Sequence, residues 1–336
     1  MIEATKDVCV IIAAKNAADT IEAAIFSALR EEQVGEVVVV DDGSSDNTAA
    51  VAERADDGSG RMKIVRFDRN RGPSAARNHA IAISSSPLIG ILDADDFFFP
   101  GRFRPLLAAE DWDFVADNIA FVDAETASEA HLKLSRFQLQ PRFLDLAAFV
   151  EGNISKRGVR RGEIGFLKPV MRRSFLESHG LRYNEDLRLG EDYDLYVRAL
   201  AKGARYKIIH SCGYGAVVRG NSLSGSHRTA DLKRLYEADR AILTESGLTN
   251  TAVDALRRHE SHVRAKYELR HFLDIKAQSG FGAALRYALA NPGAVPAIAG
   301  GIFSDKMERF HHPGGPSVTA AGSNELRYLL SAPVES

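Results

Sequence analysis

Three carboxylates follow directly on an aliphatic run in the stretch ILDADDFFFP, residues 91–100: Asp93, Asp95 and Asp96. If the run is an extended strand, Asp93 and Asp95 point to the same side of it, with their Cα atoms about 7 Å apart. Carboxylates held so close repel one another unless a cation lies beside them. Because Mg²⁺ and Mn²⁺ bind through one or two carboxylates together with substrate phosphates, the pair predicts a divalent-cation site. A solvated turn is the alternative, and the apolar residues on both sides of the acids disfavour it.

A second acidic cluster occurs in DDGSSDNT, residues 41–48, which also ends an apolar run. As a purely structural feature, it is a turn that closes a strand and caps the helix after it. As a binding feature, Asp41 or Asp42 would accept hydrogen bonds from a nucleobase or a ribose. Both interpretations stay open on the residues alone.

The elements that must position these acids alternate between strand and helix. Continuous apolar, β-branched runs predict strands covered on both faces, and apolar residues at helical spacing predict the helices between them. The expected strands are 8–14, 36–46, 62–67 and 88–96, and the expected helices are 19–31 and 74–84. This alternation predicts an α/β fold with an open, mostly parallel sheet and helices on both faces. Ligands gather at the carboxyl ends of such strands, which is where both acidic clusters fall.

Beyond about residue 110 the alternation is looser. The pattern predicts strands over 113–123 and 205–219, helices over 172–180 and 190–204, and a mainly helical chain from about residue 228. Asp194 and Arg198 have the spacing of an ion pair on one helix face. The stretch 311–325 is rich in Pro, Gly and Ser, which is typical of a flexible segment.

Composition narrows the class of protein. A chain of 336 residues with 45% hydrophobic and 26% charged residues is typical of a globular protein with a large core. Its formal net charge of -2 gives no reason to expect a nucleic-acid partner. Cys9 and Cys212 make no disulfide framework, and we see neither a secretory signal nor an unbroken apolar stretch of about 18 residues. A cytoplasmic enzyme fits these observations best.

Five motifs, in order, resemble those of the family 2 inverting glycosyltransferases, which have the GT-A fold. They are VIIAAKNAADTIEAAIFSAL, VVVVDDGSSDNT, NRGPSAARNHAI, ILDADDFFFP and GEDYDLYVR, and the resemblance covers residues 7–225. The chain is most similar to bacterial enzymes of exopolysaccharide synthesis, including succinoglycan-type glucosyltransferases. The resemblance implies a GT-A type nucleotide-binding, mixed and mostly parallel sheet flanked by helices, with a C-terminal helical extension.

The domain boundaries follow from this resemblance together with the pattern. A catalytic domain would span 1–225, with a nucleotide-sugar half at 1–110 and an acceptor half at 111–225. A helical extension would span 226–310, and 311–336 would be a flexible tail.

The resemblance also implies substrates and partners. The donor would be a UDP-sugar, with UDP-glucose expected, and the acceptor a saccharide, expected to be lipid-linked. The cofactor would be Mn²⁺ or Mg²⁺. Peripheral contact with the inner face of the cytoplasmic membrane and a homo-oligomer are further expectations, and no nucleic acid is expected.

Site residues are carried over from the family by position. Those placed at the nucleotide are the Ala13 and Ala14 backbone, Asp41 or Asp42 at the uracil or its ribose, Arg71, Arg77, and Asp93 toward the ribose. Asp93 and Asp95 match the family's metal-binding Asp-x-Asp, with Asp95 as the direct ligand. Asp192 matches the catalytic base that takes a proton from the acceptor hydroxyl. Without the resemblance, acids at the start of that helix are explained equally by the helix dipole.

The sequence departs from the family pattern in two places. The stretch after the first strand, AAKN, lacks the proline and the aromatic residue common in relatives. Relatives often have a histidine after the last strand as a metal ligand, whereas here Gly220 and Asn221 occupy that place and His227 and His210 lie away from it.

Two other classes of protein remain as alternatives. A sugar-nucleotide nucleotidyltransferase would need a Gly-rich loop, which AAKNAADT lacks. A non-catalytic nucleotide-sugar binding module would have no reason to keep repelling acids at Asp93, Asp95 and Asp192.

Two further segments carry expectations. The Gly-containing basic stretch 150–165, with Lys156, Arg157, Arg160 and Arg161, predicts a mobile loop that closes over bound donor, with a merely solvated loop as an equal alternative. The apolar residues of 281–303, followed by Lys306 and Arg309, predict a membrane-surface segment, with packing on the catalytic domain or on a second subunit as the alternative.

Overall fold

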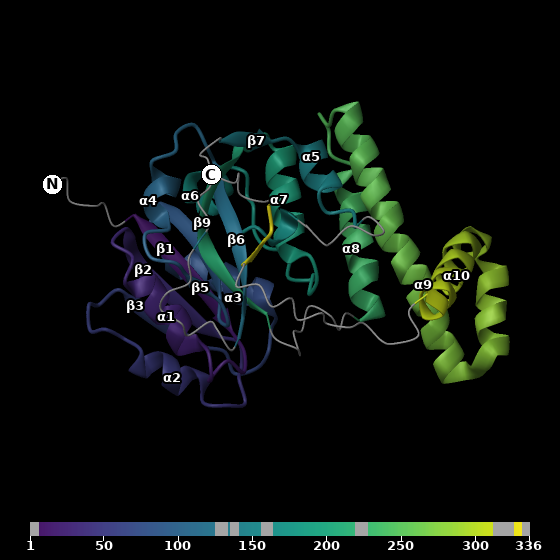
Figure 1. The fold of residues 1–336 in the computed structure, drawn as a ribbon, viewed down its shortest axis with the longest axis horizontal. Helices are drawn as coiled ribbons and strands as arrows, with labels where there is room; N and C mark the ends of the chain where they lie inside the picture. The colour runs from purple at the N-terminus through teal and green to yellow at the C-terminus, as the bar shows by residue number, and fades with distance from the viewer. Residues whose placement is uncertain are drawn as a thin grey trace. The chain divides into compact units, whose positions relative to one another are not determined.

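In a computed structural model of the chain, the structure describes residues 7–124, 134, 141–155, 164–218, 228–311 and 326–330, with only the backbone described over 304–311 (Figure 1). The chain forms two compact units. The first is Met1–Ser222 with Leu326–Ser336, and the second is Leu223–Glu325.

The first unit begins with the predicted alternation. Its parallel strands are β1 (Val8–Ala14), β2 (Val34–Asp41), β3 (Met62–Arg66) and β4 (Leu88–Asp93). The helices between them are α1 (Ile21–Leu29), α2 (Thr48–Arg54) and α3 (Pro73–Ile83). The strand order is β3-β2-β1-β4, so β1 lies between β2 and β4, and β3 lies outside β2.

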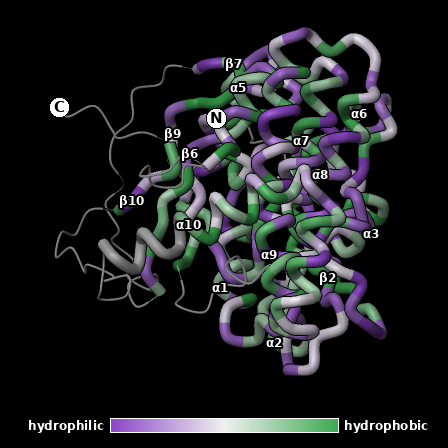
Figure 2. Tube along the Cα trace, turned by 90° about the vertical axis from the view of Figure 1, so that its right-hand side faces the viewer, coloured by the Kyte–Doolittle hydropathy of each residue, from purple (hydrophilic) through white to green (hydrophobic). Residues whose placement is uncertain are grey.

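The second half of this unit extends the same sheet with mixed strand directions. Its strands are β5 (Phe97–Phe98), β6 (Phe114–Asp123), β7 (Arg142–Leu144), β8 (Val170–Arg172) and β9 (Tyr206–Val218). Its helices are α4 (Phe103–Leu107), α5 (Leu146–Glu151), η1 (Ile164–Phe166), α6 (Arg173–Ser178) and α7 (Glu191–Ala201). β8 is antiparallel to both β4 and β6, whereas β6 and β9 are parallel. Figure 2 shows β6 and β9 side by side. The prediction of a mixed, mostly parallel sheet flanked by helices is confirmed.

One element lies where only a flexible tail was expected. Residues Arg327–Tyr328 form β10, which pairs antiparallel with β6, and Asn118 Oδ1 accepts a hydrogen bond from Leu330 N at 2.8 Å. A strand of two residues is too short to show an alternating pattern in the sequence, so it can be recognised only from its pairing with β6.

The core follows from the apolar runs. Every residue of β1 from Val8 to Ile12 is fully buried, and burial of each such side chain contributes about 1.5–3 kcal/mol. Around α7, the rings of Phe114, Phe149, Tyr196 and Tyr206 pack with centroids 5.8–6.1 Å apart. This aromatic cluster holds the helix that carries Glu191 and Asp192 against β6 and β9.

The second unit is helical, as expected. It comprises α8 (Thr229–Ile242), α9 (Asn250–Ala290), η3 (Pro292–Ala294) and α10 (Val295–His311). α9 is broken at Gly280, whose φ of 81° a residue with a side chain rarely adopts. The far end has its own small core of Phe272, Ala284, Ala294 and Ile298. Among the described helices, none is both long and apolar enough to cross a bilayer.

Candidate active site

The two acidic clusters lie beside each other because of the register of three parallel strands. Ala14 of β1 pairs with Asp41 of β2, and Ala13 of β1 pairs with Asp93 of β4. The backbone carbonyl of Ala14 also accepts a hydrogen bond from Asp42 N at 2.8 Å. The end of β1 is therefore flanked by Asp41 and Asp42 on one side and by Asp93 on the other.

Asp42 binds the loop that leads into α3. Its two carboxylate oxygens accept hydrogen bonds from the backbone N–H groups of Arg71 at 2.6 Å and Gly72 at 2.8 Å, and its side chain is buried. Gly72 has a φ of 96°, a conformation that favours glycine. Asp42 thus has a structural role in holding the Arg71 loop against the sheet.

Asp41, also buried, differs from its neighbour in having one carboxylate oxygen without a hydrogen bond. Its Oδ1 accepts a hydrogen bond from Ser44 N at 2.9 Å. Its Oδ2 is buried, lies 3.5 Å from Arg66 Nε and accepts no hydrogen bond. A buried carboxylate oxygen without a hydrogen bond is costly, so Asp41 Oδ2 is an acceptor that a donor group could satisfy.

A shallow cavity of about 520 Å³ lies beside these loops. It is lined by Arg66, Phe67, Asp68, Arg69 and Arg71. The Arg71 guanidinium lies over the Phe67 ring at 4.7 Å and that ring is buried, so the cavity lining is mainly cationic, with Asp68 as its one acid.

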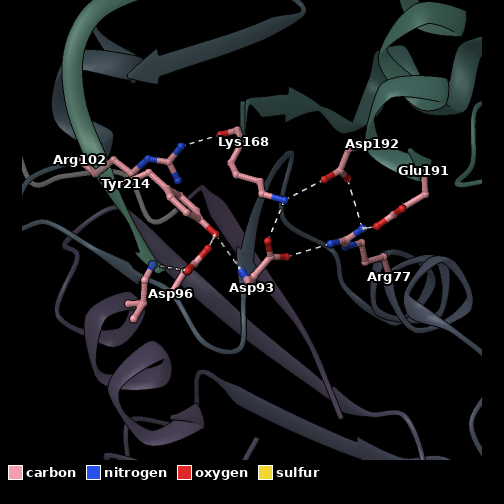
Figure 3. A network of polar contacts seen from close by, with 9 residues as sticks. Arg77, Asp93, Asp96, Arg102, Lys168, Glu191, Asp192 and Tyr214 are labelled. Atoms are coloured by element: carbon pink, nitrogen blue, oxygen red, sulfur yellow. Dashed lines mark hydrogen bonds and ion pairs between the residues drawn. The ribbon is translucent and has the colours of Figure 1, made fainter. Parts of the chain in front are cut away.

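An ion-pair network, buried except at the half-buried Asp93, joins Asp93 of β4 to Asp192 of α7 (Figure 3). Arg77 Nη2 donates to Asp93 Oδ1 at 2.9 Å, and Arg77 Nη1 donates to Glu191 Oε1 at 2.9 Å and to Asp192 Oδ1 at 3.3 Å. Lys168 Nζ lies 2.8 Å from both Asp93 Oδ2 and Asp192 Oδ2. Asp93 and Asp192, far apart in the chain, are therefore bridged by two cations, Arg77 and Lys168.

These pairs shift the protonation equilibria of the network. Burial alone would raise the pKa of Asp93, but attraction to Lys168 and Arg77 outweighs burial and holds that pKa well below its usual range. Burial would lower the pKa of Lys168, but Asp192 and Asp93 raise it above its usual range. The lysine is therefore a permanent cation in this site.

Asp96 lies on the other side of Asp93 and is bound by β9. Its Oδ2 accepts a hydrogen bond from Tyr214 Oη at 2.7 Å and its Oδ1 accepts one from Val217 N at 2.9 Å, while Asp93 N donates to Tyr214 Oη (Figure 3). Burial, with the charges of Asp93 and Asp95, raises the pKa of Asp96 to about 8. Burial is the largest cause of this shift, and the neighbouring carboxylates add to it.

A second buried pair supports the site from behind. Arg102 binds Asp117 with Nη2 to Oδ1 at 2.9 Å, and neither side chain is more than 1% exposed. Arg102 Nη2 also donates to the carbonyl of Lys168, so this pair fixes the backbone that carries the lysine.

A divalent cation that arrives with a diphosphate would have to be held by Asp93 and Asp95. No group of three or more His, Cys, Asp or Glu side chains in the described part of the chain could hold a metal ion alone. Mg²⁺, however, needs only one or two carboxylates when phosphates and waters complete its shell. Asp93, which ends β4, and the exposed Asp95, in the turn after it, would supply such carboxylates. Both oxygens of Asp93 are bound to Arg77 and Lys168, so a cation at Asp93 would have to compete with them. Of the two histidines considered above, His227 lies outside the described residues and His210 lies in β9.

The structure brings some of the expected residues together and separates others. Asp93, Asp192 and Arg77 meet in one network, whereas Arg71, Asp41 and Asp42 line the other side of β1. Asp194 pairs with Arg198 at 2.6 Å as expected. The basic residues of the expected loop over 150–165 lie outside the described residues.

Sequence reasoning missed Lys168, Tyr214 and Arg102. Lys168 offered a usable signal, because it is the one cation in the apolar stretch GFLKPVM, and a lysine buried in such a context must be paired. The sequence around Tyr214 and Arg102 contains no comparable signal.

Comparisons with known proteins show which proteins this chain is similar to. The model of the family "Glycosyl transferase family 2" matches residues 9–177. The "Succinoglycan biosynthesis protein ExoU" of Rhizobium meliloti (strain 1021) is 69% identical over 97% of this chain and 96% of its own length. The Escherichia coli "UDP-Glc:alpha-D-GlcNAc-diphosphoundecaprenol beta-1,3-glucosyltransferase WfaP" is 24% identical over 59% of this chain and 72% of its own. The crystal structure of S. aureus TarS 1-349 in complex with UDP-GlcNAc covers 87% of this chain and 81% of its own, at 18% identity and a TM-score of 0.60, which indicates a shared fold.

Proposed function

The chain belongs to glycosyl transferase family 2, and from that premise we propose that it transfers glucose from UDP-glucose, with inversion, to a lipid-linked saccharide during synthesis of a succinoglycan-type exopolysaccharide. That it is a glycosyltransferase follows from the family and from the relative that matches nearly its whole length. The glucosyl donor and the diphospholipid acceptor are taken from what the name of WfaP says of that protein.

In the proposed reaction, Asp192 is the general base. The ionised carboxylate takes the proton from the acceptor hydroxyl as the hydroxyl oxygen attacks the anomeric carbon. A new C–O bond forms, the bond from the anomeric carbon to the diphosphate breaks, and its electron pair leaves with UDP. Arg77 and Lys168 hold the two oxygens of Asp192 at 3.3 and 2.8 Å, which fixes the orientation of the base.

The rest of the site is assigned to the donor. Arg71, which lies over Phe67, and Asp41 Oδ2, which has no hydrogen bond, are assigned to the uracil and its ribose. The backbone of Ala13 and Ala14 lies at the same edge of the sheet. Asp42 acts on the donor indirectly, through the loop that it holds. Mg²⁺ or Mn²⁺ bound at Asp93 and Asp95 would supply charge stabilisation for the departing diphosphate.

One observation carries the assignment of the base. Asp192 is joined to Asp93, at the strand end where the family binds its donor, by two shared cations. The test is release of UDP from UDP-glucose, with a polyprenyl-diphosphate-linked saccharide as acceptor. Asp192→Asn should lower kcat by about 10²–10⁴-fold while UDP binds with unchanged affinity. As a matched control, Asp186→Asn changes an acid outside the network and should leave both quantities unchanged. Wild-type turnover in Asp192→Asn would refute the assignment, and loss of UDP binding in that variant would make Asp192 a donor-binding residue.

A lipid-linked acceptor requires the enzyme to work at a bilayer, and we propose that residues 275–303 of the second unit contact it. Large apolar side chains are exposed there: Phe281, Leu285, Leu289, Val295 and Phe303. The stretch contains Lys276 and Arg286, both exposed, and no acidic residue. Apolar surface with cations among its exposed side chains suits an anionic membrane surface.

Flotation with vesicles tests the surface. Wild type should float with phosphatidylcholine vesicles containing 30% phosphatidylglycerol more than with phosphatidylcholine alone, and Phe281→Ser/Leu289→Ser should not float. Phe26→Ser, which changes an equally exposed phenylalanine of the first unit, is the control and should behave as wild type. If the double variant floats as wild type does, this surface does not contact the membrane. If the wild type is a dimer and the double variant is a monomer, the surface binds a second copy instead.

A further inference from the structure

Lys168 occupies a position that conflicts with the function proposed for Asp93. Both carboxylate oxygens of Asp93 are bound to cations, Oδ1 to Arg77 Nη2 at 2.9 Å and Oδ2 to Lys168 Nζ at 2.8 Å. A divalent ion at the same carboxylate would lie close to the ammonium group, and like charges at such range repel strongly. Either the ion does not bind there or one of the two cations moves.

The geometry indicates which cation can move. Arg77 is fixed by three acids, because its two terminal nitrogens bind Asp93, Glu191 and Asp192, and it lies over the Tyr183 ring at 5.3 Å. Lys168 is bound by two acids at equal distances, so it loses only one of two bonds if it leaves Asp93. Its four-carbon side chain turns about single bonds, whereas its backbone is held by Arg102.

We infer that Lys168 is a positioning residue that exchanges partners: it bridges Asp93 and Asp192 in the ligand-free protein and binds Asp192 alone once Asp93 receives the divalent ion with the donor. This inference rests on the metal site of the proposed function. The exchange keeps the site charge-balanced in both states, because the ammonium group neutralises Asp93 until the metal ion does so. It also orders events, since Lys168 binds Asp192 without sharing its charge with Asp93 only after the donor complex has bound.

The exchange makes a prediction that a purely structural lysine does not. Lys168→Met removes the competitor of the metal ion at Asp93 and also removes a partner of the base. Binding of Mn²⁺ alone to the ligand-free protein, measured by electron paramagnetic resonance of free Mn²⁺, should therefore tighten by about tenfold, which corresponds to about 1.4 kcal/mol. At saturating Mn²⁺ and donor, kcat should fall by about tenfold or more, with KM for the donor unchanged or lower.

Two controls separate charge from position. Lys63→Met removes one positive charge from β3, away from the network, where Lys63 pairs with Glu36 at 3.0 Å, and should change neither Mn²⁺ affinity nor kcat. Lys168→Arg keeps the charge and should keep the weak Mn²⁺ affinity of the wild type. Lys168→Gln serves if Lys168→Met does not fold, since it is uncharged yet can still donate to Asp192.

The outcomes are distinguishable. Mn²⁺ affinity that is unchanged in Lys168→Met and Lys168→Gln, while the wild type requires Mn²⁺, overturns the exchange and leaves the proposed function intact. Lowered Mn²⁺ affinity in these variants also overturns it, because the lysine would then support the metal site rather than compete with the ion. Full wild-type turnover in EDTA removes the metal site itself, and with it both the exchange and the cofactor of the proposed function.

Discussion

Loss of Arg102 should destabilise the first unit more than loss of any exposed charge. The side chains of Arg102 and Asp117 are 0% and 1% exposed, and three contacts of 2.9–3.4 Å join them. In Arg102→Met the carboxylate of Asp117 stays buried without its counter-ion. Removal of one partner of a buried ion pair costs about 3–5 kcal/mol, because the remaining charge is uncompensated. We expect the free energy of unfolding to fall by that amount.

The assay is equilibrium unfolding in guanidinium chloride, followed by tyrosine and tryptophan fluorescence. The matched variant is Arg102→Met/Asp117→Asn, which removes both charges and keeps an acceptor for the N–H of Gly213, which binds Asp117. It should recover about half of the loss, since the remaining cost is packing against Phe98 and Tyr214. Arg205→Met breaks an exposed pair with Asp113 and should change the free energy of unfolding by less than about 1 kcal/mol. If Arg102→Met costs no more than Arg205→Met, or if the double variant is no more stable than Arg102→Met, the buried charge does not dominate.

Three further predictions follow from the same geometry. Asp95→Ala should abolish transfer and weaken UDP binding measured by calorimetry in Mn²⁺ but not in EDTA; equal weakening in both would show that Asp95 does not act through the ion. Burial acts to raise the pKa of Glu36, but hydrogen bonds from Ser85, Ser86 and Lys63 outweigh it and lower that pKa to about 2. Because the folded-state pKa of Glu36 is depressed, its carboxylate should make the wild type more stable than Glu36→Gln by about 2–3 kcal/mol at pH 7. This difference in the free energy of unfolding should decline as the pH falls from about 4.5 toward 2. Thermal melts of both proteins across that range measure it, and a constant difference would contradict the prediction. Gly213→Ala should lower both stability and kcat, because its Cβ would lie 2.3 Å from Arg102 Cγ and 2.8 Å from Asp117 Oδ2; Gly203→Ala, with open space around it, should affect stability only.

Much of the fold was predictable from the sequence, for a local reason. The runs VCVIIAA and VVVV are apolar and β-branched, so they form strands wherever both faces are covered, and the acids after them mark the strand ends. Parallel strands put their carboxyl ends at one edge, so the meeting of Asp41, Asp42 and Asp93 around Ala13 and Ala14 could be expected without coordinates. Helix periodicity likewise predicted α7 and the pair Asp194–Arg198 on its surface.

Only the tertiary structure decided what each acid binds. Whether Asp42 faces a nucleotide or a backbone depends on the loop at Arg71 and Gly72, which the turn at Gly72 brings to both of its oxygens. The bridge from Asp93 to Asp192 depends on Lys168, which precedes a strand antiparallel to β4, and on Arg77 from α3. Secondary structure is specified by periods of two and 3.6 residues within a segment, whereas an ion pair is specified by the distance between two segments. That distance is set by the packing of the whole sheet, so no short stretch of sequence contains it.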